Sequence, residues 1–149
     1  MHPFDPKAIL LAKHAQHVVL VHFPIALFLT GVLCDFWAHW GKKVALKAAA
    51  QFNLRAAAIM ALPALVTGIA AWQWQLEGQP LKGVLRMHLT LGLCSAAFGW
   101  LVIALRRQEW KNEMSSLPVS HAMFELAAVL VVALTGHLGG MVSGVNLPG

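Results

Sequence analysis

Four long apolar runs constrain the fold of this chain more than any other feature. They cover residues 18–37, 56–72, 84–105 and 119–141. Each run holds roughly 17 to 23 residues, the length that a helix needs to cross ~30 Å of hydrocarbon. A segment that spans lipid on its own must be a helix, because lipid offers the backbone no hydrogen-bonding partner. The sequence therefore predicts an integral membrane protein with four transmembrane helices.

The composition agrees with a chain embedded in lipid. Apolar residues make up 58% of the sequence and charged residues 11%, whereas about a quarter of a soluble domain is charged. The connections between the runs are short, which favours an all-α, up-down-up-down four-helix bundle formed by one domain over residues 1–149. No basic run with interleaved aromatic residues is present, so we expect membrane lipid rather than nucleic acid as a partner.

Tryptophans and cationic residues mark the ends of the predicted spans. Indoles favour the headgroup level of a bilayer, and those near span ends are Trp37, Trp40, Trp72, Trp74 and Trp110. Cations flank the connections between spans one and two and between spans three and four: Lys42, Lys43, Lys47, Arg55, Arg106, Arg107 and Lys111. The opposite side has fewer: Lys7, Lys13, Lys82 and Arg86. The positive-inside rule then predicts a multi-pass membrane protein with both termini outside the cytoplasm.

Three of the eight histidines fall inside predicted spans at a similar depth. His22 and His88 lie about one turn inside spans one and three, and His137 lies about one turn before the end of span four. Spans one and three run in one direction and span four runs back, so all three residues approach the outer face. An ionisable side chain inside a span is a functional candidate and usually faces the bundle interior.

Small residues beside these histidines favour a large, flat ligand. Gly92 lies one turn below His88, and Gly140 closely follows His137. Imidazole is a common axial ligand of haem iron, and helical bundles hold such cofactors between facing helices. We therefore expect two of the three histidines to ligate haem b, while the third supports the site. Arg86, near the outer surface, is expected to pair with a haem propionate.

Two other interpretations of the three histidines remain open. Small residues on membrane helices most often serve close packing, and a histidine can simply make one interhelical hydrogen bond. A copper site is the second alternative, because Met87 adjoins His88 and Met141 follows His137 by four residues. Histidine combined with methionine suits copper.

Other polar residues lie outside this trio. His14 and His17 precede span one, and we expect them to be solvated rather than to extend the site. Four more lie nearer the inner face: Asp35, His39, His121 and Glu125. We interpret these as the polar ends of helices. The alternative is a second haem or a proton path between the two histidines of that group.

Three segments carry a resemblance to a known family. The run His22-Phe23-Pro24-Ile25-Ala26-Leu27 resembles the signature of a bacterial membrane family, domain of unknown function "twenty-two thirty-one". That family has four predicted spans, an Arg-x-His at the start of span three like Arg86-Met87-His88, and a Gly-Gly segment like Gly139-Gly140. The phrase around His137 also resembles membrane domains fused to c-type cytochromes. The resemblance implies a redox setting.

These observations lead to one expected function and two alternatives. We expect a haem b-binding subunit that passes electrons between a periplasmic redox partner and either quinone or another membrane subunit. A c-type cytochrome partner would be a separate polypeptide, because the chain contains no CxxCH motif for covalent haem attachment. The alternatives are a non-catalytic anchor of a larger complex and a copper-binding membrane protein. A redox or anchor subunit is expected rather than a stand-alone enzyme.

Overall fold

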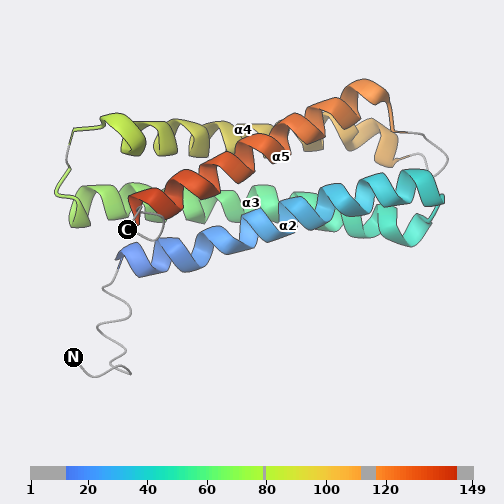
Figure 1. The fold of residues 1–149 in the computed structure, drawn as a ribbon. Helices are drawn as coiled ribbons and strands as arrows, with labels where there is room; N and C mark the ends of the chain where they lie inside the picture. The colour runs from blue at the N-terminus through green and yellow to red at the C-terminus, as the bar shows by residue number, and fades with distance from the viewer. Residues whose placement is uncertain (1–12, 79, 112–116, 144–149) are drawn as a thin grey trace.

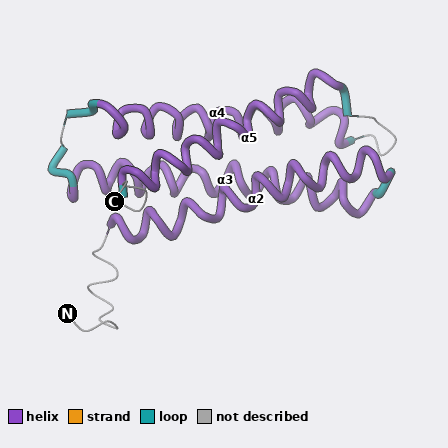
Figure 2. The backbone as a smooth tube through the Cα atoms, in the orientation of Figure 1, coloured by secondary structure: helices purple, strands orange, loops and turns teal. Residues whose placement is uncertain are grey.

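The computed structural model describes residues 13–78, 80–111 and 117–143, and all regular structure within them is helical (Figures 1 and 2). The helices are α2 (Lys13–Gly41), α3 (Val44–Gln75), α4 (Gly83–Trp110) and α5 (Val119–Val142). Each is long and apolar enough to cross a membrane, which confirms the predicted four-span, all-α fold. The shortest, α5, has 24 residues and is therefore about 36 Å long, more than the ~30 Å of hydrocarbon.

The helices form an antiparallel bundle in which each packs against its neighbour in the chain. Contacts between α2 and α5 close the bundle. The start of α2, the turn between α3 and α4 and the end of α5 lie together (Figure 1). We call this the outer end, following the predicted orientation. The turn between α2 and α3, the end of α4 and the start of α5 lie at the opposite, inner end.

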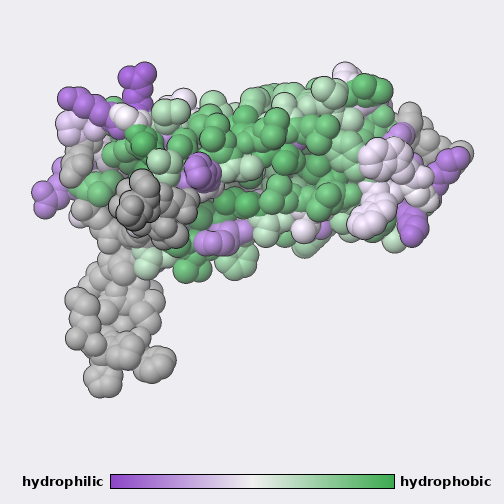
Figure 3. All heavy atoms as spheres, viewed as in Figure 1, coloured by the Kyte–Doolittle hydropathy of each residue, from purple (hydrophilic) through white to green (hydrophobic). Residues whose placement is uncertain are grey.

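The outward surface of the bundle is apolar along its middle. Figure 3 shows hydrophobic residues across the centre of the visible face and hydrophilic residues gathered mainly toward the two ends. Large apolar side chains such as Phe52, Val66 and Leu130 are exposed. An exposed apolar surface of this extent is unsuited to water and suited to lipid.

Helix α3 begins at Val44, well before the predicted span at residues 56–72. Its polar first turns are helical because they pack against the end of α4. Lys47 donates from Nζ to the carbonyl of Glu109 at 3.2 Å, and Gln51 donates to the carbonyl of Trp110 at 3.4 Å. These side chains donate to carbonyls in the last turn of α4, where the N–H groups of a following turn are lacking.

Of the tryptophans predicted at span ends, three are exposed, Trp72 is half-buried and one is buried. Trp37, Trp40 and Trp74 are exposed, as expected for indoles at the headgroup level. Trp110 is the last residue of α4 and is buried, with the guanidinium of Arg55 lying 5.2 Å from its ring centroid. Trp110 thus lies at the end of its span, as expected, but its side chain faces the bundle interior rather than the headgroups. Its indole instead packs beneath a cation from α3.

Candidate functional site

The three predicted site histidines have different surroundings. His88 on α4 is half-buried, and its Nδ1 lies 3.1 Å from the carbonyl oxygen of Thr135 on α5. His22 on α2 is exposed, and its Nδ1 lies 2.6 Å from the carbonyl of Val18 in its own helix. His137 on α5 is also exposed. His88 is therefore held between α4 and α5, while the ligand role predicted for two of the three histidines stays a prediction.

A fourth histidine joins His88 inside the bundle. His17, in the first turns of α2, is half-buried, so the expectation that it is solvated is wrong. Its Nδ1 lies 3.0 Å from the carbonyl of Ala64 and 3.3 Å from the hydroxyl of Thr67, both on α3. The ring centroids of His17 and His88 are 6.3 Å apart, with an interplanar angle of 74°. We call these two residues the histidine pair.

Two glycines bring helix backbones directly against the histidine pair. A Cβ atom on Gly68 of α3 would lie 2.9 Å from Cε1 of His17. A Cβ atom on Gly139 of α5 would lie 3.0 Å from Cε1 of His88. Both distances are shorter than ordinary carbon contacts of about 3.5–4.0 Å. Each imidazole is thus held by a carbonyl on one side and by a glycine backbone beside it.

The other residues predicted for the cofactor site are Gly92, Gly140 and Arg86. A Cβ on Gly92 would meet side-chain atoms of Leu65 and Thr135 at 4.0 Å, which is ordinary van der Waals contact. Gly140 is half-buried in the last turn of α5. Arg86 is exposed in the first turn of α4, at the same end of the bundle as the histidine pair.

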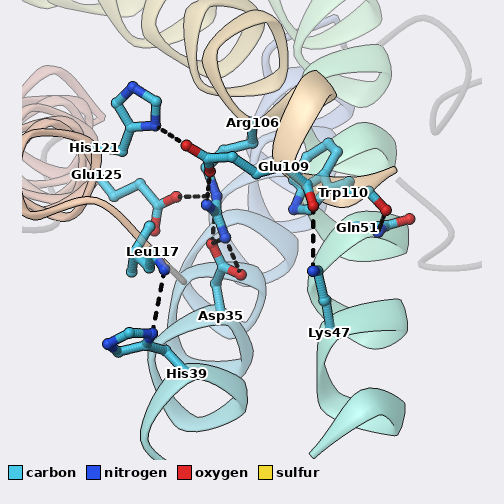
Figure 4. A network of polar contacts seen from close by, with 10 residues as sticks. All are labelled: Asp35, His39, Lys47, Gln51, Arg106, Glu109, Trp110, Leu117, His121 and Glu125. Atoms are coloured by element: carbon cyan, nitrogen blue, oxygen red, sulfur yellow. Dashed lines mark hydrogen bonds and ion pairs between the residues drawn. The ribbon is translucent and has the colours of Figure 1, made fainter. Parts of the chain in front are cut away.

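A cluster of charged side chains lies at the inner end (Figure 4). Arg106 of α4 is buried and donates from Nε and Nη2 to the two oxygens of Asp35 on α2, at 2.8 and 2.7 Å. It also donates from Nη1 to Glu109. Its Nε lies 3.4 Å from Oε1 of Glu125 on α5. We call these four residues with His121 the charged cluster; it joins α2, α4 and α5.

His121 links the charged cluster to the surface of the inner end. Its Nδ1 lies 2.6 Å from Oε1 of Glu109, and its side chain keeps 24% of its surface exposed. His39 lies apart, accepting a hydrogen bond at Nδ1 from the backbone N–H of Leu117 at 3.2 Å. Asp35 and Glu125 are each only 1% exposed. The interpretation of these residues as polar helix ends is therefore wrong for the two carboxylates, which point into the bundle (Figure 4).

Comparison with known protein families identifies the family of this chain. A family model described as Predicted membrane protein (DUF2231) matches residues 13–145. The chain belongs to the DUF2231 family. The match covers all four helices of the bundle. No curated protein and no solved structure matches the chain.

The segments that carry the resemblance to DUF2231 meet in the tertiary structure. His88, from the Arg-x-His segment of α4, contacts Gly139 of the Gly-Gly segment of α5. Ile25, from the segment that starts at His22, lies 3.7 Å from the Cβ position of Gly136 on α5. The DUF2231 segments are thus distant in sequence but converge on the outer half of α5.

The ring spacing of the histidine pair in this DUF2231 chain can be compared with that of two imidazoles on one metal ion. Within the described ranges, no group of three or more His, Cys, Asp or Glu residues could hold a metal ion. Imidazole nitrogen lies about 2 Å from a metal that it ligates, so two imidazoles on opposite sides of one ion have centroids roughly 6 Å apart. The 6.3 Å separation of His17 and His88 is close to that value. The spacing of the two ring centroids, and that spacing alone, is the one expected for two imidazoles on one ion.

Replacing Gly139 with alanine is expected to displace the imidazole of His88. The new Cβ would lie 3.0 Å from Cε1, so the rigid ring must move and part of the α4–α5 contact is lost, at about 1–3 kcal/mol. Gly136→Ala is the matched control, because its Cβ would meet Ile25 at an ordinary 3.7 Å. Thermal unfolding in detergent and the NMR shifts of labelled histidine rings measure the effect. Equal ring shifts in both variants would contradict it.

Sequence reasoning missed three residues of these sites, Arg106, Glu109 and His17, and nothing in the sequence singled out Glu109. Arg106 was counted among loop cations, yet it is 3% exposed inside the bundle. The signal for it was Asp35, because a carboxylate within a span needs a cationic partner at the same depth. His17 was missed because it precedes the apolar run of span one, whereas α2 starts at Lys13 and carries it inward. His14, considered beside it, has a side chain outside the described part of the chain.

Proposed function

We propose that this protein is a haem b-binding electron-transfer subunit of the bacterial inner membrane, with His88 and His17 as the axial ligands. The observation that carries the proposal is the histidine pair. Two imidazoles from different helices, α2 and α4, lie 6.3 Å apart at one end of a membrane bundle. Bound haem would supply a one-electron carrier at that end.

The hydrogen bonds of the pair support a ligand role. The carbonyl oxygens of Ala64 and Thr135 can only accept hydrogen bonds, so a neutral imidazole facing either one carries its hydrogen on Nδ1. That tautomer places the lone pair on Nε2, the atom that ligates metals in this arrangement. Ligating histidines usually have their second nitrogen oriented by such an acceptor.

The surroundings of the pair also suit the proposal. Small residues border both rings: Ala64, Thr67, Gly68, Thr135 and Gly139. Arg86 is exposed at the same end, where its guanidinium can pair with a propionate. His22 and His137 also belong to the outer half, and in this proposal they lie outside the ligand set.

The remaining cations support the proposed orientation. Arg106 is paired inside the bundle and no longer counts as a loop charge. Among the described residues, exposed cations are still more numerous at the inner end (Lys42, Lys43, Arg107 and Lys111) than at the outer end (Lys82 and Arg86). With that end in the cytoplasm, the histidine pair faces the periplasm. A periplasmic c-type cytochrome is then the expected redox partner. Quinone or another membrane subunit would be the second partner in the electron transfer.

An optical spectrum of the protein, purified after haem-supplemented expression, tests this function. We expect a Soret band, with α and β bands that sharpen on dithionite reduction. His88→Ala and His17→Ala should each lose the bis-histidine spectrum, because each removes an axial ligand. His22→Ala and His137→Ala are matched controls at the same end, and both should retain it.

Other results of this spectroscopic test distinguish the alternative ligand sets and functions. Loss of the spectrum in His22→Ala or His137→Ala, with retention in His17→Ala, would return the ligand role to the originally predicted trio. A colourless sample with stoichiometric copper would assign the site to copper. A colourless, metal-free sample would reject the redox proposal and leave a non-catalytic anchor subunit.

A further inference from the structure

The charged cluster at the inner end holds more buried negative than positive groups. Arg106 supplies one guanidinium, whereas Asp35, Glu109 and Glu125 supply three carboxyl groups. Asp35 accepts two of its hydrogen bonds and Glu109 accepts a third. The donors of the guanidinium are therefore directed mainly at two of the three carboxyl groups.

Glu125 is the carboxyl group left without a donor. Its side chain is 1% exposed, and neither of its oxygens accepts a hydrogen bond from the described residues. Its nearest cationic atom, Nε of Arg106 at 3.4 Å, already donates to Asp35 at 2.8 Å. A buried carboxylate without a donor is costly, and two carboxylates that share one site cannot easily both be ionised. The arrangement favours a proton on Glu125.

Charged groups on the remaining elements are directed at other partners. On α3, Lys47 donates to the carbonyl of Glu109, and Arg55 lies over the ring of Trp110. On α2, His39 accepts a hydrogen bond from Leu117. The groups that face Glu125 are thus Asp35 from α2 and Arg106 from α4, with Glu109 and His121 one step further out (Figure 4).

We propose that Glu125 is an exchangeable proton-binding site within the bundle and that His121 and Glu109 connect it to the inner surface. His121 lies one turn before Glu125 on α5 and is partly exposed, so it can take a proton from water. It contacts Glu109, and Arg106, which keeps its own protons, holds Glu109 and Glu125 on one guanidinium, so water must carry the proton across this last step. The ligand is a proton delivered by water. This inference does not depend on which cofactor the outer end binds.

Infrared spectroscopy of the protein in lipid nanodiscs tests the site. At neutral pH the wild-type protein should show the carbonyl band of a buried, protonated carboxylic acid, which shifts in D₂O and disappears at alkaline pH. Glu125→Gln should lack this band, while Glu77→Gln, at an exposed turn between α3 and α4, should keep it. Glu109→Gln should keep it too, which distinguishes Glu125 from the other glutamate that contacts Arg106.

The route is tested by the rate at which the band shifts after transfer to D₂O. His121→Phe should slow that shift several-fold while leaving the position of the band unchanged. Absence of an acid band in the wild-type protein at neutral pH overturns the proton site, and this measurement needs no variant. A band that survives in Glu125→Gln assigns the proton elsewhere and also overturns it. An unchanged rate in His121→Phe overturns the route.

Discussion

Replacing Arg106 with alanine is expected to destabilise the folded protein by about 3–5 kcal/mol, because it leaves buried carboxylates without their counter-charge. Asp35 is 1% exposed and receives two hydrogen bonds from this guanidinium, so it cannot recover them from water without opening the bundle. Contacts between Arg106 and three carboxyl groups also tie α2, α4 and α5 together. Their loss removes a connection at the inner end that apolar packing cannot replace.

The measurement is unfolding in a mild detergent, followed by circular dichroism, together with the yield of folded protein. Arg107→Ala is the matched control, because Arg107 is the next residue of α4 and is exposed. The double variant Asp35→Asn/Arg106→Gln should recover part of the loss, because it removes both charges instead of leaving one unpaired. Similar destabilisation in Arg106→Ala and Arg107→Ala would show that the buried ion pairs contribute little.

Alanine at Gly31 is expected to destabilise the contact between α2 and α3 by about 1–3 kcal/mol. The added Cβ would lie 2.8 Å from Cγ of Leu54 and 3.1 Å from the backbone nitrogen of the same residue. Leu54 is 1% exposed and belongs to the hydrophobic core, so its side chain has little room to move. The backbone contact can be relieved only by separating the two helices. This strain outweighs the gain of up to about 1 kcal/mol in helix propensity from glycine to alanine.

Gly92→Ala is the matched control, because the added Cβ would meet Leu65 and Thr135 at 4.0 Å. Gly92→Ala should leave stability unchanged or raise it slightly. Leu54→Ala combined with Gly31→Ala should cost less than the sum of the two single changes, because the smaller side chain relieves the clash. Thermal unfolding of the wild-type protein, Gly31→Ala, Leu54→Ala and the double variant in one detergent gives the stabilities that this double-mutant cycle needs. Strict additivity would show that the two residues do not interact.

The spans could be predicted from the sequence because they depend on local properties. Length and hydropathy are sufficient to identify a helix that crosses lipid, since the backbone must satisfy its own hydrogen bonds there. Helix boundaries were less accurate, as α3 shows. Its first turns contain Lys47, Gln51 and Arg55, which end the apolar run, but contacts with the end of α4 hold them in the helix.

The sequence did not predict in the same way which side chains face the bundle interior and which face lipid. In a soluble bundle the polar face of a helix shows which side is outward, but lipid tails are as apolar as a protein core. His17 and His22 illustrate the consequence. His22 lies within the apolar run yet is exposed, whereas His17 lies before the run and contacts α3. One residue of α-helix turns the side chain by about 100°, so depth along the helix does not decide facing.

The sequence by itself determined that the chain spans a membrane four times and which polar residues lie near each membrane face, because burial in lipid depends on composition along the chain. Only the tertiary structure decided which of those residues meet. It placed His17 beside His88 and directed Arg106 to Asp35, pairs that are far apart in the sequence. Such pairings depend on the rotation and register of helices against one another. Those are set by close contacts such as Gly31 with Leu54 and Gly139 with His88.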